Sequence, residues 1–218
     1  MYPPKFDYYR ADSVRQAVAL MKEHDGRFLA GGQSLIPVMN LRLADPGTVI
    51  DIGRIDSLKG IWKRGHMAGP RGERNVQADD FFVGLFETAL QADELLVGFA
   101  VFDERPNTGS AYKKLPNPAS RYAMVGAAAQ VTIDNGKFRK AGVAVGGLTP
   151  QATRASSVEA ALVGNPVSDE TIAAAATAVV DDLGDEVMGD IHASADYRRQ
   201  MAPVFVRRAL ETAVSRAR

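Results

Sequence analysis

The chain has 218 residues, of which 46% are hydrophobic and 24% charged, as is ordinary for a globular protein of one large or two small domains. Its 26 basic residues balance 26 acidic ones, and the zero net charge argues against a nucleic-acid or anionic-membrane partner. The lack of cysteine excludes disulfides, cysteine nucleophiles and iron–sulfur clusters held by this chain's own thiolates.

The sequence also lacks the usual signs of a metal site or a membrane segment. The three histidines, His24, His66 and His192, stand far apart and match no metal-ligand spacing. No apolar run approaches membrane-spanning length, and the N-terminus lacks the apolar core of a signal peptide. We therefore expect a soluble, cytoplasmic protein with no bound metal and no membrane span.

The first fifty residues alternate helix and strand signals. Residues 11–26 predict a helix that Ser13 can cap, and residues 27–31 predict a short buried strand. A second helix is expected over 35–43 and a second strand over 47–53. This alternation is typical of α/β units.

The middle of the chain carries weaker signals. Residues 64–75 are polar, contain three glycines and a proline, and predict a loop. A short helix within 75–90 and an apolar strand over 93–104 follow, and residues 105–124 predict a loop-rich segment around one short strand. A domain boundary is therefore expected between Gly65 and Thr108.

The last part of the chain predicts a hairpin followed by helices. Two apolar runs within 125–148 are joined by Asn135-Gly136, a pair that suits a tight turn with positive φ. The predicted fold class is α+β, with a small N-terminal α/β unit followed by an antiparallel sheet and a C-terminal helical cluster. The predicted helices cover 156–164, 168–184 and 194–217, and Pro203 is expected to kink or interrupt the third. The predicted domains are 1–64, 65–108 (a remnant and linker) and 109–218.

The segment Ala-Gly-Gly-Gln-Ser at 30–34 stands between the first strand and the second helix and has two interpretations. It can be a tight strand-to-helix turn in which Ser34 is the N-cap. Alternatively, glycines that lack Cβ atoms and free N–H groups at a helix start can bind a phosphate or pyrophosphate. The segment is neither a P-loop nor a G-x-G-x-x-G fingerprint.

A family resemblance favours the second interpretation. The run LAGGQSLIPVMNLRLADPGTVIDIGRIDSLKGI resembles the first segment of the FAD-binding medium subunits of molybdenum hydroxylases, which include the aerobic carbon monoxide dehydrogenase medium subunit and the flavin domain of xanthine dehydrogenase. Further segments follow the family's order: GPRGERNVQADDFFVGLFETALQADELL, GSAYKKLPNPASRYAMVGAAAQVTI, GGLTPQATRASSVEAALVG and SADYRRQMAPVFVRRALETA. The resemblance covers nearly the whole chain.

The resemblance implies an FAD site but no catalytic residue. By this resemblance, backbone groups in the glycine segment wrap the FAD pyrophosphate, the first residue of the second helix approaches the flavin, and a lysine and an aromatic residue lie close to the flavin ring. The implied cofactor-binding residues are Ala30, Gly31, Gly32, Gln33, Ser34, Leu35, Lys114 and Tyr122.

The chain departs from the family in the middle. Relatives carry a further subdomain there with a second glycine motif, T-I-G-G, and nothing in this sequence resembles it. Half of an enclosing site should hold a large ligand weakly, so we expect FAD binding to be weak or absent in the isolated chain. Three explanations stay open: natural loss of the segment and of the flavin, a shortened form of a longer protein, or retention of FAD with help from partner subunits.

The resemblance implies an oxidoreductase subunit that passes electrons from iron–sulfur clusters to FAD and on to an external acceptor. The implied partners are an iron–sulfur small subunit and a molybdenum-pterin large subunit, in a hetero-oligomer. One alternative is a non-catalytic structural subunit of such a complex with lost or weakened FAD binding. A second alternative, of another class, is a free-standing module that binds a small anion at residues 30–34. The substrate of the complex is not encoded in this chain.

Overall fold

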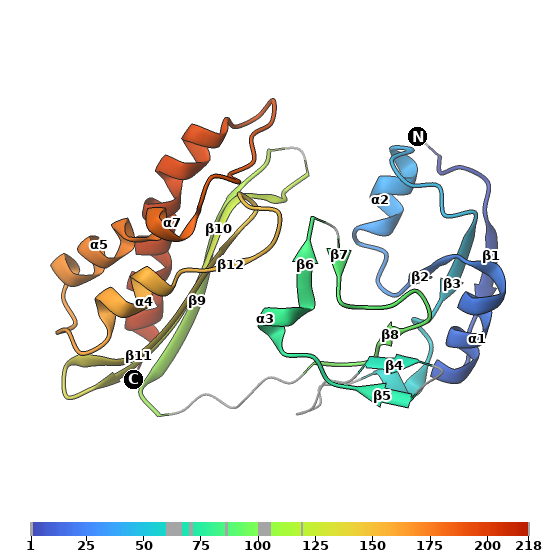
Figure 1. Ribbon diagram of the computed structural model, residues 1–218, viewed down its shortest axis with the longest axis horizontal. Helices are drawn as coiled ribbons and strands as arrows, with labels where there is room; N and C mark the ends of the chain where they lie inside the picture. Colours follow the sequence, from blue (N-terminus) through green and yellow to red (C-terminus); the bar gives the residue numbers. More distant parts are fainter. Residues whose placement is uncertain are drawn as a thin grey trace. The chain divides into compact units, whose positions relative to one another are not determined.

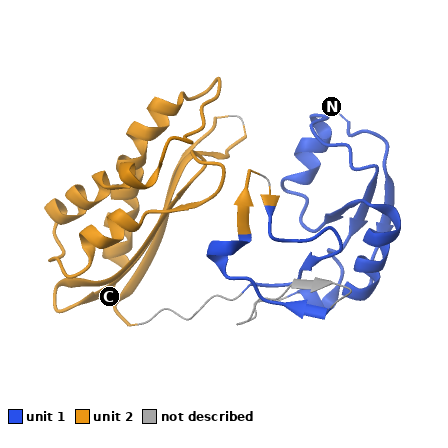
Figure 2. Cartoon of the chain, viewed as in Figure 1, with its two compact units in different colours: residues 1–81, 88–102 blue, residues 82–87, 103–218 orange. Residues whose placement is uncertain are grey.

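The computed structural model describes residues 2–59, 67–69, 72–85, 87–99, 106–118 and 120–217 (Figure 1). The chain divides into two compact units (Figure 2). Unit 1 comprises residues 1–81 and 88–102, and unit 2 comprises residues 82–87 and 103–218. With 34% helix and 28% strand, the structure confirms the predicted α+β fold class.

Unit 1 is built on a small parallel sheet. Its strands lie in the order β1-β3-β2, so β3 is central and pairs in parallel with both neighbours. Leu29 and Asp51 are register partners, and the two strands that they end therefore stop at the same edge of the sheet. The elements are β1 (Asp7–Arg10), α1 (Val14–His24), β2 (Arg27–Leu29), α2 (Leu35–Asn40), β3 (Thr48–Asp51) and the 3-10 helix η1 (Asp56–Leu58).

The sequence predicts the helices of this unit and their order with β2 and β3, but β2 is shorter than the strand expected over 27–31 and is exposed or half-buried, because it lies at an edge of the sheet. The side chain of Ser13 accepts the N–H of Gln16 and caps α1 as expected. Helix α2 ends at Asn40, three residues before the predicted end. Strand β1 was not predicted, because its residues are mostly exposed and show no buried alternation.

One face of α1 packs on the sheet and forms the core of unit 1. Ala17, Val18 and Met21 are buried at helical spacing, and they belong to one apolar cluster with Ile50 and Ile52. Ile50 is fully buried, and burying such a side chain stabilises a fold by about 1.5–3 kcal/mol.

The middle segment differs from the sequence prediction. Two short antiparallel strands lie where residues 64–75 predicted a loop: Gly69 pairs with Gly72, whose φ of +101° is a conformation that glycine adopts readily. Residues 60–66, 70–71 and 100–105, which include parts of the predicted loop and apolar strand, lie outside the described residues. The elements here are β4 (Met67–Gly69), β5 (Gly72–Arg74), α3 (Ala78–Phe81), β6 (Phe82–Gly84), β7 (Glu87–Thr88) and β8 (Leu95–Leu96). The predicted helix within 75–90 is only α3, and the strand predicted over 93–104 is reduced to β8 within its described residues, 93–99.

An ion pair fastens this middle segment. The Arg74 guanidinium donates from Nε and Nη2 to both carboxylate oxygens of Glu94, each at 2.7 Å. The same Nη2 donates to the carbonyl of Ala89 at 2.6 Å. These bonds join β5 to the chain that leads into β8.

Unit 2 is built on an antiparallel sheet in the order β12-β11-β10-β9. The predicted hairpin is confirmed, since Asn135 (φ 49°) and Gly136 (φ 71°) form the turn between β10 and β11. The first strand of the sheet is longer than the predicted short strand, because its lysines, serine and glycine hide an edge strand of nine residues. The strands are β9 (Thr108–Pro116), β10 (Ala123–Asp134), β11 (Lys137–Gly146) and β12 (Thr153–Arg154).

Helices cover one face of this sheet (Figure 1). The predicted helix over 168–184 is divided at Ala178 into two. Pro203 does not interrupt the last helix: buried Ala202, Phe205 and Val206 hold that turn against the sheet, and this packing offsets the lost hydrogen bond. The helices are α4 (Ser156–Leu162), α5 (Asp169–Thr177), α6 (Val179–Asp182) and α7 (Ala195–Arg216).

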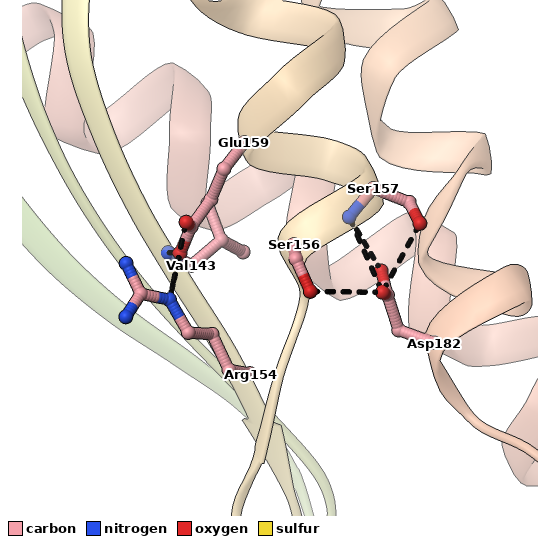
Figure 3. Close-up of polar contacts among 6 residues, drawn as sticks. All are labelled: Val143, Arg154, Ser156, Ser157, Glu159 and Asp182. Atoms are coloured by element: carbon pink, nitrogen blue, oxygen red, sulfur yellow. Dashed lines mark hydrogen bonds and ion pairs between the residues drawn. The ribbon is translucent and has the colours of Figure 1, made fainter. Parts of the chain in front are cut away.

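Two carboxylates fasten α4 to its neighbours (Figure 3). Glu159 accepts the backbone N–H of Val143 at 2.9 Å and the Nε–H of Arg154 at 3.0 Å, which ties the helix to β11 and β12. On another side of the same helical turn, Asp182, the last residue of α6, accepts the N–H of Ser157 at 3.1 Å. The hydroxyls of Ser156 and Ser157 also donate to Asp182, at 3.4 and 3.1 Å, so this carboxylate holds the first turn of α4 against the end of α6.

Candidate functional site

The glycine turn, residues 30–34, follows β2 at the carboxyl edge of the parallel sheet. The N–H of Ile52, just after β3, donates to the carbonyl of Leu29 at 2.9 Å, so the two strand exits lie side by side. Ligands of open parallel sheets bind outside the carboxyl ends of the strands. The turn therefore stands where such a fold places a ligand.

The fold requires glycine at only one of the two glycine positions in this turn. Gly32 has φ +73°, and a Cβ there would lie 3.0 Å from Cγ1 of Ile36. Gly31 has no such requirement, since a Cβ there would meet only Cγ of Gln33, at 3.9 Å. The fold needs glycine at position 32, whereas at position 31 glycine leaves open space beside the backbone.

The amide groups of the turn are available to an acceptor. Within the described part of the chain, the N–H groups of Gly31, Gly32, Gln33 and Ser34 donate to no protein atom, and the first bond of this segment runs from Ile36 N–H to the Gly32 carbonyl at 3.2 Å. Ser34 occupies the N-cap position, but its backbone is helical (φ −107°, ψ −48°) and its side chain makes no capping bond. Ser34 is therefore the N-cap by position, as one interpretation predicted, but it supplies no side-chain acceptor to the following N–H groups.

Sequence reasoning missed a tyrosine and a carboxylate at the strand ends beside the glycine turn. The Tyr8 hydroxyl and the Gly53 N–H both donate to the Asp51 carboxylate, the latter at 2.8 Å. The hydrogen bond from Tyr8, and after it the one from Gly53, lower the pKa of Asp51. The hydrogen bond to Asp51 raises the pKa of Tyr8. A Cβ on Gly53 would lie 3.5 Å from the Ala30 carbonyl oxygen. The cluster thus fixes the strand ends next to the glycine turn.

The other two predicted residues are Lys114, in β9, and Tyr122, the last residue of the edge loop, residues 117–122, which joins β9 to β10. Nζ of Lys114 donates to the carbonyl of Arg121 at 2.8 Å. Arg121 itself has φ +63°, and its N–H bonds to the Asn117 carbonyl at 3.0 Å. Tyr122 is 54% exposed. The edge loop therefore presents an ammonium group and an aromatic ring together at an exposed edge of the sheet.

Tyr112 is a further exposed aromatic residue that sequence reasoning missed. A Cβ on Gly126 would lie 2.5 Å from the Tyr112 hydroxyl, so the tyrosine ring lies across this glycine. Alternation from buried Ala111 in β9 was the signal that could have placed Tyr112 on the uncovered face.

The predicted site residues divide between the two units. Ala30, Gly31, Gly32, Gln33, Ser34 and Leu35 lie together in unit 1, whereas Lys114 and Tyr122 lie together in unit 2. Among the described residues, no helix combines the length and the apolar character needed to cross a bilayer.

Comparison with protein families identifies two flavoprotein domains in the chain. The family model of the FAD binding domain in molybdopterin dehydrogenase matches residues 4–68. The family model of the CO dehydrogenase flavoprotein C-terminal domain matches residues 110–213. The chain belongs to the family of FAD-binding medium subunits of molybdenum hydroxylases.

Individual members of this family are similar to the chain over nearly its whole length. The chain is 28% identical to the carbon monoxide dehydrogenase medium chain of Hydrogenophaga pseudoflava, over 99% of each chain. It is also 28% identical to the 6-hydroxypseudooxynicotine dehydrogenase complex subunit alpha of Paenarthrobacter nicotinovorans, over 100% of this chain and 97% of the relative. A solved structure of reconstituted CO dehydrogenase from Oligotropha carboxidovorans matches 100% of both chains, with a TM-score of 0.91 and 26% identity. The homologues have about 290 residues, so the 218-residue chain is shorter than they are.

Proposed function

We propose that this chain binds FAD as the medium subunit of a molybdenum-containing hydroxylase or dehydrogenase complex. The observation that carries the proposal is the glycine turn at the carboxyl edge of a parallel sheet, in a chain whose two family domains follow in the expected order. The residues present fit the cofactor. The successive N–H groups of residues 31–34, which donate to no protein atom in the described part of the chain, suit the anionic pyrophosphate, and Gly31 leaves the space that a close approach of the pyrophosphate requires.

The chain's own residues bind and orient the cofactor on this proposal. Residues 30–34 donate backbone hydrogen bonds to the pyrophosphate, and Leu35 approaches the flavin. Lys114 and Tyr122 contact the ring system, where an ammonium group and an aromatic face can hold it in place and exclude water. FAD supplies the redox chemistry when bound, and no residue of this chain acts as an acid, base or nucleophile.

The proposed partners are an iron–sulfur small subunit and a molybdenum-pterin large subunit in a cytoplasmic hetero-oligomer. The family of medium subunits supports them, and the chain has no cysteine with which to hold clusters of its own. Electrons released at the molybdenum subunit would cross the clusters to FAD and leave to an external acceptor.

The length of the chain favours a second candidate. The chain has 218 residues against about 290 in its homologues, and the resemblance implies that the missing length is the segment that carries the family's second glycine motif. A structural subunit with lost or weakened FAD binding is therefore the alternative, and we propose that the isolated chain holds FAD weakly.

Competition among nucleotides tests the proposal at the glycine turn. We expect ADP to displace FAD from the chain, as followed by flavin fluorescence, because ADP carries the pyrophosphate that residues 30–34 would bind. Riboflavin, which lacks the pyrophosphate, should compete far less. No displacement by ADP would contradict the proposed site, and no FAD binding even at millimolar concentration would favour the structural alternative for the isolated chain.

A further inference from the structure

Arg198, in the first turn of α7, is a buried arginine that the proposed cofactor site does not use. It is only 5% exposed. Its Nη1 donates to the carbonyl of Gly147 at 2.6 Å and to that of Met124 at 3.4 Å. Its Nη2 donates to the Asp190 carboxylate, and its Nε to the Ala193 carbonyl at 3.3 Å. One guanidinium thus joins the start of β10, the turn after β11 and the loop before α7.

Met124, one of these partners, is the extra residue of a β-bulge. In the pairing of β10 with β9, Ala123 faces Pro116 and Val125 faces Leu115, so Met124 has no register partner. A bulge re-aims the side chains next to it, and bulges are frequent beside functional sites. Arg198 supplies the Met124 carbonyl with a donor from outside the sheet.

The turn after β11 also packs closely against the start of β10. Gly147 has φ +82°, and a Cβ there would lie 2.2 Å from the Ala123 carbonyl oxygen. Only glycine permits this close approach. Because Arg198 holds Gly147 by its shortest bond to a carbonyl, the start of β10 is confined between the guanidinium and this turn.

The confined residues directly follow the edge loop. Tyr122 precedes Ala123, and its carbonyl accepts the Asn117 N–H at 2.7 Å, which closes the loop that Lys114 also contacts. We infer that Arg198 is a positioning residue for the flavin-contacting edge: it fixes the bulge at Met124 and thereby the direction of Tyr122. This inference rests on the proposed function in assigning Tyr122 to the flavin.

A double-mutant cycle on FAD affinity tests the inference in the full-length chain. Arg198→Lys keeps the positive charge beside Asp190 but loses the fork that reaches two carbonyls. We expect it to raise the Kd for FAD about tenfold, or about 1.4 kcal/mol. In a Tyr122→Ala background the same change should raise Kd less than about twofold, because the residue through which Arg198 acts is already gone. Equal effects in both backgrounds would overturn the inference.

Amide hydrogen exchange gives a second measurement that needs no cofactor. Arg198→Lys should speed exchange over residues 117–125 and leave α5 and its flanks unchanged. Arg199→Lys is the matched control, because Arg199 lies in the same helical turn and also donates to a carbonyl, that of Gly184. Arg198 does not position this edge if exchange becomes faster throughout unit 2, or if it is not accelerated at residues 117–125.

The two measurements separate the inference from the proposed function. A wild-type chain that binds no FAD contradicts the proposed function, and the exchange pattern alone then decides whether Arg198 fixes the edge loop. If Arg198→Lys is too unstable to titrate, Asp190→Asn keeps the arginine and removes its carboxylate partner. It should give the same exchange pattern at smaller amplitude, and an unchanged pattern would overturn the inference.

Discussion

Replacing Gly31 by valine separates the binding role of the glycine turn from its role in the fold. The nearest atom to a Cβ at this position is 3.9 Å away, so Gly31→Val should change the free energy of unfolding by no more than about 0.5 kcal/mol. The added methyl groups would occupy the space that the pyrophosphate needs. Losing two charge-assisted hydrogen bonds of about 1.5–3 kcal/mol each would weaken FAD binding by roughly two to four powers of ten.

Gly32→Val provides the contrast. Its φ of +73° and the 3.0 Å approach to Ile36 mean that a valine strains the backbone and the core side of the turn. We expect a loss of about 1–3 kcal/mol in stability together with the loss of binding.

Thermal unfolding and FAD titration by flavin fluorescence measure both quantities. Gly47→Ala is the control, since Gly47 in the same unit also has positive φ, and a Cβ there would meet no atom within 4 Å. It should cost about 1–2 kcal/mol in stability and leave FAD affinity unchanged. A folded Gly31→Val chain that binds FAD as the wild type does would refute the pyrophosphate assignment.

Three further outcomes are expected. The isolated chain should bind FAD with a Kd in the micromolar to millimolar range, roughly three to six powers of ten weaker than a complete site, and stoichiometric nanomolar binding in a fluorescence titration would contradict this. Glu159→Ala should lower the free energy of chemical unfolding by about 1–3 kcal/mol, because the Val143 N–H loses its acceptor. Arg154→Ala should lower it by less than about 1 kcal/mol, because that arginine is largely exposed. Equal losses for the two variants would refute this interpretation. The N–H of His192 and the Arg198 guanidinium lower the pKa of Asp190 to about 2, so its stabilising effect is present above the unfolded pKa of about 3.9 and is lost as pH falls toward 2. Asp190→Asn should therefore flatten the fall in melting temperature between about pH 4 and 2, and an unchanged slope would exclude this linkage.

The sequence predicted the elements whose signals are local. The Asn135-Gly136 turn and the Ser13 cap depend on neighbouring residues only, and both are present in the structure. Strands β1 and β9 are edge strands of their sheets. The residues of β1 are mostly exposed, and the polar side chains of β9 dilute the run of apolar residues that marks a strand. Pro203 shows the opposite case, in which packing in the complete fold outweighs a strong local preference.

The candidate site was less predictable than the fold. The glycine turn could be located by its sequence, but the helical backbone of Ser34 and its missing capping bond could not. Lys114 and Tyr122 carry no local signal, because their place beside one loop follows from strand register. Arg198 could have been found from its spacing: it precedes buried Ala202 and Phe205 by four and seven residues and so shares their helix face.

The flavin content of the assembled complex tests the central claim most directly. The chain would be purified together with its iron–sulfur and molybdenum-pterin subunits, and the flavin released by denaturation would be identified and counted against the chain. The account predicts FAD, at one molecule per chain, even if the isolated chain loses it during purification. A complex that contains both partners and no flavin would contradict the claim that this subunit binds FAD.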